Sequence, residues 1–547
     1  GKTRLLMLQS AFAASRRLVF RTHPRLSSVR PHRPPPQHAA NMSTRVLAAG
    51  GPELAFTPPP ANLASAAKRV RVVGRLPALH GCDVLKPLIP LLKKAGDSKT
   101  TLLATDAADE PVELSAVVLP NQDKLSRCNS PAATQAIEKA LGPVEAGDCV
   151  LLIVDDPAHA FAAGCAAARC FPLYSAKTKS AEEAEDAKPA EPVTVAIGVS
   201  ADGGAPAPLP DALLARISAA AEGIRLAQRL VDSPPNVMNC DELTAEAEAL
   251  AARFPETVTA EVKRYEALKA GGFGGLEAVG RSAAFAGREP ALVVLKHTPA
   301  GGKASRKVAL VGKSIVYDTG GLSLKPTAGM CSMKTDMGGG AAVLGAFCGA
   351  LAGGCDDVEL TAILCIAENS ISAHSYRNDD VITPYSGKTV EINNTDAEGR
   401  IVLADGVAYA SKDVKPDLIV DLATLTGAQM ISTGKRHASI LTPSEEVEVE
   451  AVKAGKVSGD LVHPMIYCPE LFDDEFKSQV ADMKNSVKDR MNAQSACAGQ
   501  FVLNQIHPSY EGDALHVDMA GPSTTGEGRG TGYGVALCLQ LIGLGQP

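Results

Sequence analysis

Two stretches of the chain alternate short β-branched runs with Ala-rich segments. Between Arg69 and Val199 the runs are RVRVVGRL, LSAVVLP, DCVLLIV and VTVAIGV, and segments such as AATQAIEKAL and HAFAAGCAAARC lie among them. Further along, ALVVLKH, KVALVG, LTAILCI and DLIVDLATL alternate with helical stretches in the same way. This alternation predicts α/β structure. Strands that are apolar throughout indicate a sheet covered by helices on both faces.

The pattern predicts two α/β domains joined by a helix. We expect a smaller N-terminal α/β domain over residues 53–210 and a larger C-terminal domain over 236–547, with a central mixed sheet covered by helices. Between them, a helical pattern from Asp211 to Val231 must end at the sequence SPPN, because proline disfavours helical geometry in the residue before it. We therefore place a linker helix over 211–235.

Two local features complete this outline. The segment SAKTKSAEEAEDAKPAEP is polar and charged, which predicts an exposed insertion near 175–192 before the last strand of the first domain. Asp241 can cap a helix that runs to about Phe254.

Composition narrows the class of function. A net charge of −7 over 547 residues, with no basic stripe outside the N-terminal tail, gives no reason to expect nucleic acid binding. Thirteen Cys without a C-x-x-C pair indicate a reducing compartment and mostly buried thiols. No apolar run approaches the roughly 18 to 20 residues of a membrane span. We expect a soluble protein with no membrane partner, acting on a small molecule or a peptide.

The first 52 residues form a basic tail. They hold nine Lys or Arg and no acidic residue, with much Ser, Ala and Pro, which is typical of an organellar transit peptide. A mitochondrial location is then the alternative to the cytoplasmic one that we expect. The other interpretation is that translation starts at Met42, and the opening residue Gly1 favours it. Both interpretations stay open.

Charged residues gather where predicted elements end. The stretch VALVGKSIVYDTGGLSLK predicts a buried strand running into a Gly-rich loop that carries Lys313, Asp318 and Lys325. Such strand ends are where α/β sheets bind ligands. Asp336 comes just before a Gly-Gly-Gly helix start, where glycine allows close backbone approach. Taken alone, Asp336 would more often be a helix cap.

A third cluster of charge lies in NNTDAEGR, residues 393–400. Asp396, Glu398 and Arg400 are spaced two apart, so in an extended segment they would share one side. Carboxylates aimed at one spot need raised pKa values or a cation between them. With Asp318 and Asp336 there are four carboxylates, which favours two divalent metals bridged by shared ligands.

These residues also carry a family resemblance. The string NTDAEGR resembles the signature of the leucyl aminopeptidase (cytosol aminopeptidase) family of dinuclear metallopeptidases. The resemblance covers Lys313 to Gly427 and continues more weakly to the C-terminus. Stretches such as VYDTGGLS, ENS, LATLTGAQ and ADMKNSV look most like the branch of probable aminopeptidase-like proteins. The first 200 residues resemble the family only in architecture.

The resemblance implies a role for each matching residue. Lys313, Asp318, Asp336 and Glu398 would hold one metal ion, and Asp318, Asp396 (also through its carbonyl) and Glu398 the other. Lys325 and Arg400 would be the catalytic pair. Lys313 can ligate only as a neutral amine, so bound metals must lower its pKa. Substrate would contact Lys325, Met333, Asn394, Thr424, Leu425 and Gly427.

The chemistry of these roles can be stated separately. A cationic Lys325 would stabilise the oxyanion, and the metals would acidify a bridging water into the attacking hydroxide. Arg400 offers a planar fork of donors, and the resemblance implies that it holds bicarbonate as general base. Mn²⁺ or Zn²⁺ fits the ligand set, with Mg²⁺ and Co²⁺ also compatible. His374, His437 and His463 lack zincin spacing, so we expect them to be structural.

The sequence thus predicts a metalloexopeptidase that releases N-terminal residues, Leu or other apolar ones, from short peptides. Two alternatives stay open, namely a dipeptidase narrowed to Cys-Gly and an inactive binding or scaffold protein of the same fold. The resemblance further implies a homohexamer, a dimer of trimers whose active sites face an interior cavity.

Overall fold

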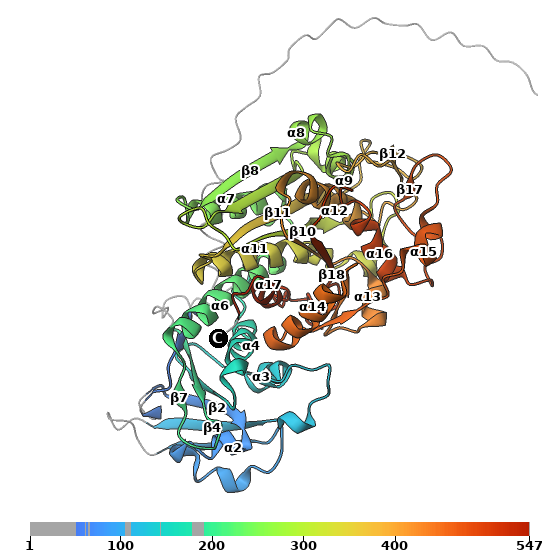
Figure 1. Ribbon diagram of the computed structural model, residues 1–547. Coiled ribbons are helices and arrows are strands. Elements are labelled where there is room, and N and C mark those ends of the chain that lie inside the picture. The colour runs from blue at the N-terminus through green and yellow to red at the C-terminus, as the bar shows by residue number, and fades with distance from the viewer. Residues whose placement is uncertain are drawn as a thin grey trace, which may run out of the picture. The chain divides into compact units, whose positions relative to one another are not determined.

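The computed structural model describes residues 51–60, 62–63, 66–103, 111–142, 144–177 and 191–545. The basic tail up to residue 50 and residues 178–190 of the expected insertion lie outside these ranges, so the predictions made for them stay predictions. Within the described part, helices and strands alternate around two main sheets, which confirms the α/β class (Figure 1).

The N-terminal sheet is built from the predicted β-branched runs. Its strand order is β1-β6-β5-β2-β4-β3, with β7 paired to β6. The pairs are parallel except β3 with β4 and β6 with β7, so this sheet is mixed. The strands are β1 Leu54–Thr57, β2 Arg69–Arg75, β3 Ser98–Leu103, β4 Val112–Leu119, β5 Cys149–Val154, β6 Val193–Val199 and β7 Ala207–Pro208; the main helices are α3 Thr134–Ala140 and α4 Ala160–Arg169.

The predicted linker helix is α6, Asp211–Asp232. It ends where expected, because Ser233 takes an extended conformation before Pro234. A Cβ on Gly223 would lie 2.2 Å from the carbonyl oxygen of Gly345, so α6 and α11 (Gly338–Ala352) pack backbone against backbone. The helix is confirmed, while the domain boundary that we place around it remains a prediction.

The larger sheet has the order β16-β15-β18-β14-β10-β11-β9-β8. Strands β11, β10, β14 and β18 pair in parallel with one another. The pairs of β9 with β11, of β8 with β9 and of β15 with β18 are antiparallel, so the expected mixed sheet is confirmed. The strands are β8 Val258–Arg264, β9 Ala291–His297, β10 Arg306–Asp318, β11 Val358–Asn369, β14 Leu418–Ala423, β15 Ala438–Leu441, β16 Val462–Pro464 and β18 Asp513–Asp518.

Helices cover both faces of this sheet. Val308 and Leu310 of β10 belong to one apolar core, and Ala309 and Val311 belong to another, as the alternation of side chains along a strand requires. The first core includes residues of α6, α7, α11, α14 and α17, and the second includes residues of α8, α9, α12 and α16. These are α7 Cys240–Ala252, α8 Tyr265–Ala270, α9 Gly274–Ala284, α12 Gly399–Tyr409, α14 Glu445–Ser458, α16 Gln494–Leu503 and α17 Val535–Leu541.

Shorter elements surround the edge of the sheet. They comprise a small sheet of β12 Val381–Ile382, β13 Val390–Glu391 and β17 Met483–Lys484, and the helices α10 Thr327–Met330, α13 Gly427–Ser432 and α15 Pro469–Phe472.

Two sequence expectations are wrong. The cap of α7 is Asn239 and not Asp241, because Asn239 accepts hydrogen bonds from the backbone N–H groups of Asp241 (2.9 Å) and Glu242 (3.2 Å). The expectation that no apolar run approaches a membrane span is also wrong. The stretch Thr327–Ala352, which contains α10 and α11, is long and apolar enough to cross a membrane by length and composition. Its apolar window is 89% buried inside the molecule, as is usual for a core helix.

Candidate metal centre

The site begins inside the central strand. We expected Lys313 and Asp318 in a loop, but β10 continues through both residues, because its pairing with β11 extends to Asp318 opposite Asn369. Lys313 is therefore a buried strand residue, and Asp318 lies at the carboxyl end of the strand. The carboxyl ends of the parallel neighbours β11 and β14 meet the same edge of the sheet.

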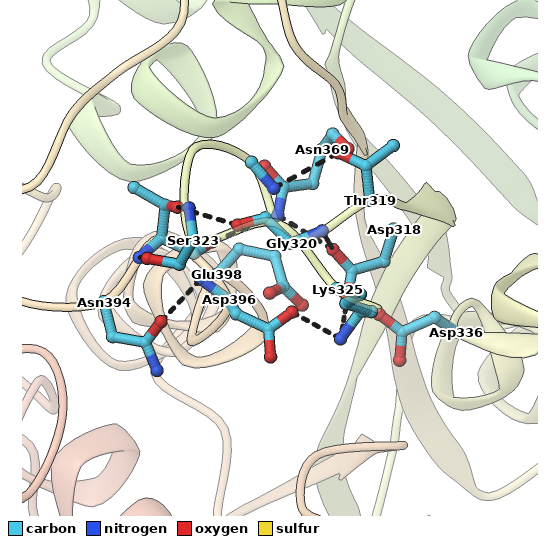
Figure 2. Close-up of polar contacts among 12 residues, drawn as sticks. Asp318, Thr319, Gly320, Ser323, Lys325, Asp336, Asn369, Asn394, Asp396 and Glu398 are labelled. Atoms are coloured by element: carbon cyan, nitrogen blue, oxygen red, sulfur yellow. Dashed lines mark hydrogen bonds and ion pairs between the residues drawn. The ribbon is translucent and has the colours of Figure 1, made fainter. Parts of the chain in front are cut away.

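A glycine turn brings Lys325 back over this edge. Gly320 and Gly321 have φ values of 83° and 62°, in the region that favours glycine. The N–H of Gly320 donates to Asp318 Oδ1 at 2.8 Å. Lys325 Nζ then lies 2.8 Å from Asp318 Oδ2 and 2.5 Å from Asp396 Oδ1, as Figure 2 shows.

Asp336 does not cap a helix. It follows the short turn Met333–Thr335, and the N-cap of α11 is Met337, which makes no side-chain capping bond. Asp336 Oδ1 instead lies 2.8 Å from Lys313 Nζ and accepts a hydrogen bond from Thr424 Oγ1 at 2.9 Å. The three glycines act as expected, since a Cβ on Gly339 would lie 2.1 Å from the carbonyl oxygen of Leu422.

The NTDAEGR segment is not extended. Asp396 lies in a turn, Glu398 directly precedes α12, and Arg400 is in its first turn. Spacing alone could not show this, because a helix start breaks the two-residue alternation. Glu398 Oε1 still lies 3.0 Å from Lys313 Nζ, whereas Arg400 Nη1 donates to the Asn485 carbonyl at 3.1 Å.

Three of the predicted ligand residues converge. Asp318, Asp336 and Glu398 are all buried and each offers a carboxylate oxygen within 4.8 Å of the others. Asp336 Oδ2 and Glu398 Oε2 have no hydrogen-bond partner among the described residues. With Asp396 added, four carboxylates face two lysines, an excess of negative charge that fits bound cations.

The side chains shift one another's protonation. Burial raises the pKa of Asp336 well above its ordinary value. Burial alone would lower the pKa of Lys313, but the carboxylates of Asp336 and Glu398 outweigh it and raise that pKa. The fall expected for a metal-ligating Lys313 requires the charge of the metal ions, so it belongs to the proposal below. Burial lowers the pKa of Arg400 to about 10.

Sequence reasoning missed the residues that hold the ligands in place. Asn369 Nδ2 donates to Asp318 Oδ1 (2.8 Å) and to the Thr395 carbonyl (3.1 Å), as Figure 2 shows in part. Thr395 Oγ1 donates to the Gly320 carbonyl at 2.7 Å and so ties the two loops together. Asn485 Nδ2 donates to the Asn394 carbonyl at 2.7 Å. The signals for Asn369 were a polar residue closing an apolar strand and its place in ENS, one of the stretches that resemble the family.

The predicted substrate residues lie in or next to the segments that carry this centre. Thr424 uses its carbonyl to accept from Lys313 Nζ at 2.9 Å, and Leu425 N–H donates to Asp518 Oδ1 at 3.1 Å. Asn394 Oδ1 accepts from the N–H of Asp396 at 3.0 Å. Gly427 is exposed at the start of α13, and Met333 is half-buried beside Asp336. Their proposed contacts with substrate remain predictions.

The three histidines singled out from the sequence contact residues outside the metal centre. His374 stacks on Phe285 with ring centroids 3.7 Å apart, and His437 Nε2 lies 2.9 Å from the Cys128 carbonyl. His463 Nδ1 lies 3.0 Å from the carbonyl of Pro464.

Comparison with known proteins identifies the family. Residues 225–539 match the family model described as the cytosol aminopeptidase family, catalytic domain. The chain belongs to the cytosol aminopeptidase family. The match confirms the predicted resemblance, and this family is typically metal-dependent, in keeping with the buried acidic cluster.

Several relatives of the cytosol aminopeptidase family are similar over most of the chain. The probable aminopeptidase NPEPL1 of Homo sapiens is 48% identical over 424 residues, which are 77% of this chain and 78% of that protein. Leucine aminopeptidase 1 of Caenorhabditis elegans is 40% identical over 426 residues, 77% of this chain and 82% of that protein. The resemblance to the probable aminopeptidase-like branch is thereby confirmed.

The fold agrees with a solved structure of the family. Leucyl aminopeptidase from Trypanosoma brucei, in complex with bestatin, superposes with a TM-score of 0.81 at 35% identity, covering 93% of this chain and 99% of that one. This confirms the predicted architecture of a smaller N-terminal and a larger C-terminal α/β part.

Proposed function

We propose that this chain is a metal-dependent aminopeptidase that releases N-terminal residues, Leu or other apolar ones, from short peptides. The observation that carries the proposal is the buried cluster of Asp318, Asp336 and Glu398, with carboxylate oxygens that lack partners in the described part of the chain. Four carboxylates beside two lysines leave an excess of buried negative charge, which is costly unless cations are bound, so the cluster supports a metal site.

Two divalent ions per chain fit the residues present. Lys313 (as a neutral amine), Asp318, Asp336 and Glu398 would hold one, and Asp318, Asp396 and Glu398 the other. Mn²⁺ or Zn²⁺ suits this set, with Mg²⁺ or Co²⁺ as further candidates. When bound, the ions would polarise the scissile carbonyl and activate water as the nucleophile.

The chain's own residues would orient and stabilise the substrate. Lys325 carries its ammonium group at the edge of the cluster, where it can hold the developing oxyanion. Arg400 is buried, and its Nε has no hydrogen-bond partner among the described residues, which supports a bound planar anion such as bicarbonate as general base. Met333, Asn394, Thr424, Leu425 and Gly427 would line the place of the first residue.

The test is release of p-nitroaniline from leucyl-p-nitroanilide by the full chain. We expect a chelator to abolish the release and added Mn²⁺ to restore it. If no activity on this or on short Leu peptides is restored by metal, the proposal fails and the binding or scaffold alternative gains. If Cys-Gly is cleaved far better than Leu-Gly, the chain is a narrowed dipeptidase.

We further propose a homohexamer, a dimer of trimers, in which active sites facing an interior cavity would admit only short peptides. Family membership supports this assembly. Native mass spectrometry of the full chain would give six copies.

For the compartment we propose the cytoplasm, with the mitochondrion as the alternative if residues 1–52 direct import. Fluorescent fusions with and without these residues would separate the two locations.

A further inference from the structure

A buried tyrosine is hydrogen-bonded to the loop that carries Asp396. Tyr376 is 2% exposed, and its hydroxyl group donates to the Thr395 carbonyl at 2.7 Å. Burial, and next the Glu398 carboxylate, raise the pKa of Tyr376 well above its ordinary value. The hydroxyl group therefore keeps its proton and remains a donor to this loop.

The peptide group between Thr395 and Asp396 is held at both ends. Its carbonyl accepts from Tyr376 and also from Asn369 Nδ2 at 3.1 Å. Its N–H group donates to Asn394 Oδ1 at 3.0 Å (Figure 2). Because a peptide group is planar and includes the Cα of the following residue, its orientation determines where that residue begins. The three bonds therefore hold the backbone of Asp396 in place.

Asp396 depends on this support more than the other proposed carboxylate ligands do. Its side chain is 32% exposed, whereas those of Asp318, Asp336 and Glu398 are at most 8% exposed. A side chain that packing does not confine keeps more rotamer freedom, which is lost when it binds an ion. Hydrogen bonds that fix the backbone reduce the freedom that remains to be lost.

The opposite part of the cluster is held by a different residue. Asp336 Oδ1 accepts from Thr424 Oγ1 at 2.9 Å, and Lys313 Nζ donates to the Thr424 carbonyl at 2.9 Å. Among the described residues, the hydroxyl group of Tyr376 bonds only to the loop of Asp396. Loss of this hydroxyl group should therefore disturb one part of the centre and leave the other part intact.

We propose that Tyr376 is a positioning residue for the metal ion that Asp396 helps to hold. It acts through the Thr395 carbonyl. The inference rests on the proposed function, which assigns Asp396 to one of the two ions only. Removing a hydrogen bond that holds a metal ligand in place typically costs about tenfold or more in metal affinity, so the ion next to Asp396 should bind more weakly without it.

The test is calorimetric titration of the chelator-treated full chain with Mn²⁺, which gives an affinity for each ion. In Tyr376→Phe one ion should bind about tenfold or more weakly, while the other keeps its affinity. Tyr533→Phe is the matched control, because Tyr533 is 5% exposed and also donates to a backbone carbonyl, that of Leu461, at 2.6 Å. Leu461 lies outside the segments that carry the proposed ligands, so both ions should keep their affinity in this control.

A double variant shows which ion is affected. Asp396→Asn should weaken the ion that Asp396 helps to hold. Tyr376→Phe combined with Asp396→Asn should bind that ion little more weakly than Asp396→Asn alone, because residues that act through one another are not additive. In Tyr376→Phe alone, excess Mn²⁺ should restore peptide cleavage, since the substitution removes no ligand.

The proposal is overturned if the wild type binds fewer than two ions, if both affinities fall equally, or if neither changes in Tyr376→Phe. An equal loss in Tyr533→Phe or additive losses in the double variant would also overturn it. So would a Tyr376→Phe chain that does not fold by circular dichroism, because the hydroxyl group would then support the whole fold.

The proposed function can fail separately from this inference. The expected pattern of Mn²⁺ affinities in a chain that cleaves no peptide would sink the proposed function and keep the role of Tyr376. Metal-dependent cleavage with unchanged Mn²⁺ affinities in Tyr376→Phe would do the reverse.

Discussion

Gly399 lies so close to Lys313 that a Cβ there would meet Lys313 Cε at 2.5 Å. The glycine in NTDAEGR is thus a packing requirement of the neighbouring strand. Its absent side chain leaves Lys313 room to reach both Asp336 and Glu398.

We therefore predict that Gly399→Ala folds but loses the site. The added methyl group would push the Lys313 amine away from its carboxylate partners, and mutations of residues that hold a metal ligand in place typically cost about 10- to 100-fold in metal affinity. Circular dichroism checks that the variant folds, and metal content after dialysis checks that it loses the site. Gly142→Ala, where a Cβ would meet its nearest atom at an ordinary 3.7 Å, is the matched control. Full metal content in the Gly399 variant would contradict the packing argument.

Lys325 and Lys313 differ in the roles proposed for them. Lys325→Ala should lower kcat by about 100- to 1000-fold, the usual cost of losing an oxyanion donor, while leaving metal content near two ions per chain. Kinetics and metal analysis of the same preparation measure both, with Lys303→Ala as an exposed control. If metal and turnover disappear together, the division of roles between the two lysines is wrong.

Residue chemistry determined how much of this site was predictable. Lysines and carboxylates crowded at strand ends point to metal binding, because such charge needs compensation. Asn369 and Asn485 could not be identified in this way, since a single amide after a strand or in a loop is common. Their importance depends on partners distant in sequence, such as Asp318 and the Asn394 carbonyl.

At the scale of elements, helix α12 supplies a cap for the neighbouring helix α9. Helix α9 makes no side-chain cap of its own at Phe273. Asp405 of α12 instead accepts hydrogen bonds from the N–H groups of Leu276 and Tyr385, both at 2.7 Å. Asp405 is fully buried, and this burial raises its pKa to about 7.

The raised pKa gives a pH dependence with a definite sign. The folded state holds the Asp405 proton more tightly than the unfolded state does, so its contribution to stability is complete below about pH 4 and is lost as pH rises through about 7. In Asp405→Asn the side chain cannot titrate. Its NH₂ group would face a backbone N–H, so that two donors would oppose each other. We expect it to be about 1–3 kcal/mol less stable at low pH, with the difference shrinking toward pH 7. Urea unfolding of both proteins from pH 4 to 8 tests this; a constant difference would refute it.

The elements were predicted better than their ends. The apolar runs identified the main strands, because burial on both faces leaves no polar alternation to misinterpret. β10 proved longer than expected and the NTDAEGR segment became a turn and a helix start, since Lys313 and the charged motif interrupt the apolar pattern that marks an element. These departures occur at the site itself, where charge is gathered for chemistry.

At the scale of the whole molecule, a buried ion pair links the N-terminal sheet's helix α4 to the larger part. Arg169 Nη2 lies 2.6 Å from Asp460 Oδ1, and Asp460 Oδ2 accepts from the N–H groups of Gly534 and Leu537 at the start of α17. Neither side chain of the pair is more than 8% exposed.

Arg169→Met should lower the free energy of unfolding by about 3–5 kcal/mol, because it leaves the Asp460 carboxylate buried without its partner. Urea unfolding measures the loss. Lys86→Met, which removes the exposed partner of Asp83, should have little effect. Equal stability of the two variants would mean that α4 and α17 are held together by apolar packing alone.

The strand order of the larger sheet has a consequence for biosynthesis. β10 pairs with β14, which begins at Leu418, and β14 pairs with β18, which ends at Asp518. Asp518 accepts from the N–H groups of Leu425 and Thr426 beside the metal centre. Pairing between segments so distant in sequence is slow and must wait for the later strand to emerge from the ribosome. A nascent chain that stopped before β18 would contain every proposed ligand but would lack the Asp518 carboxylate that holds Leu425 and Thr426, so we expect the centre to form only after β18 has emerged.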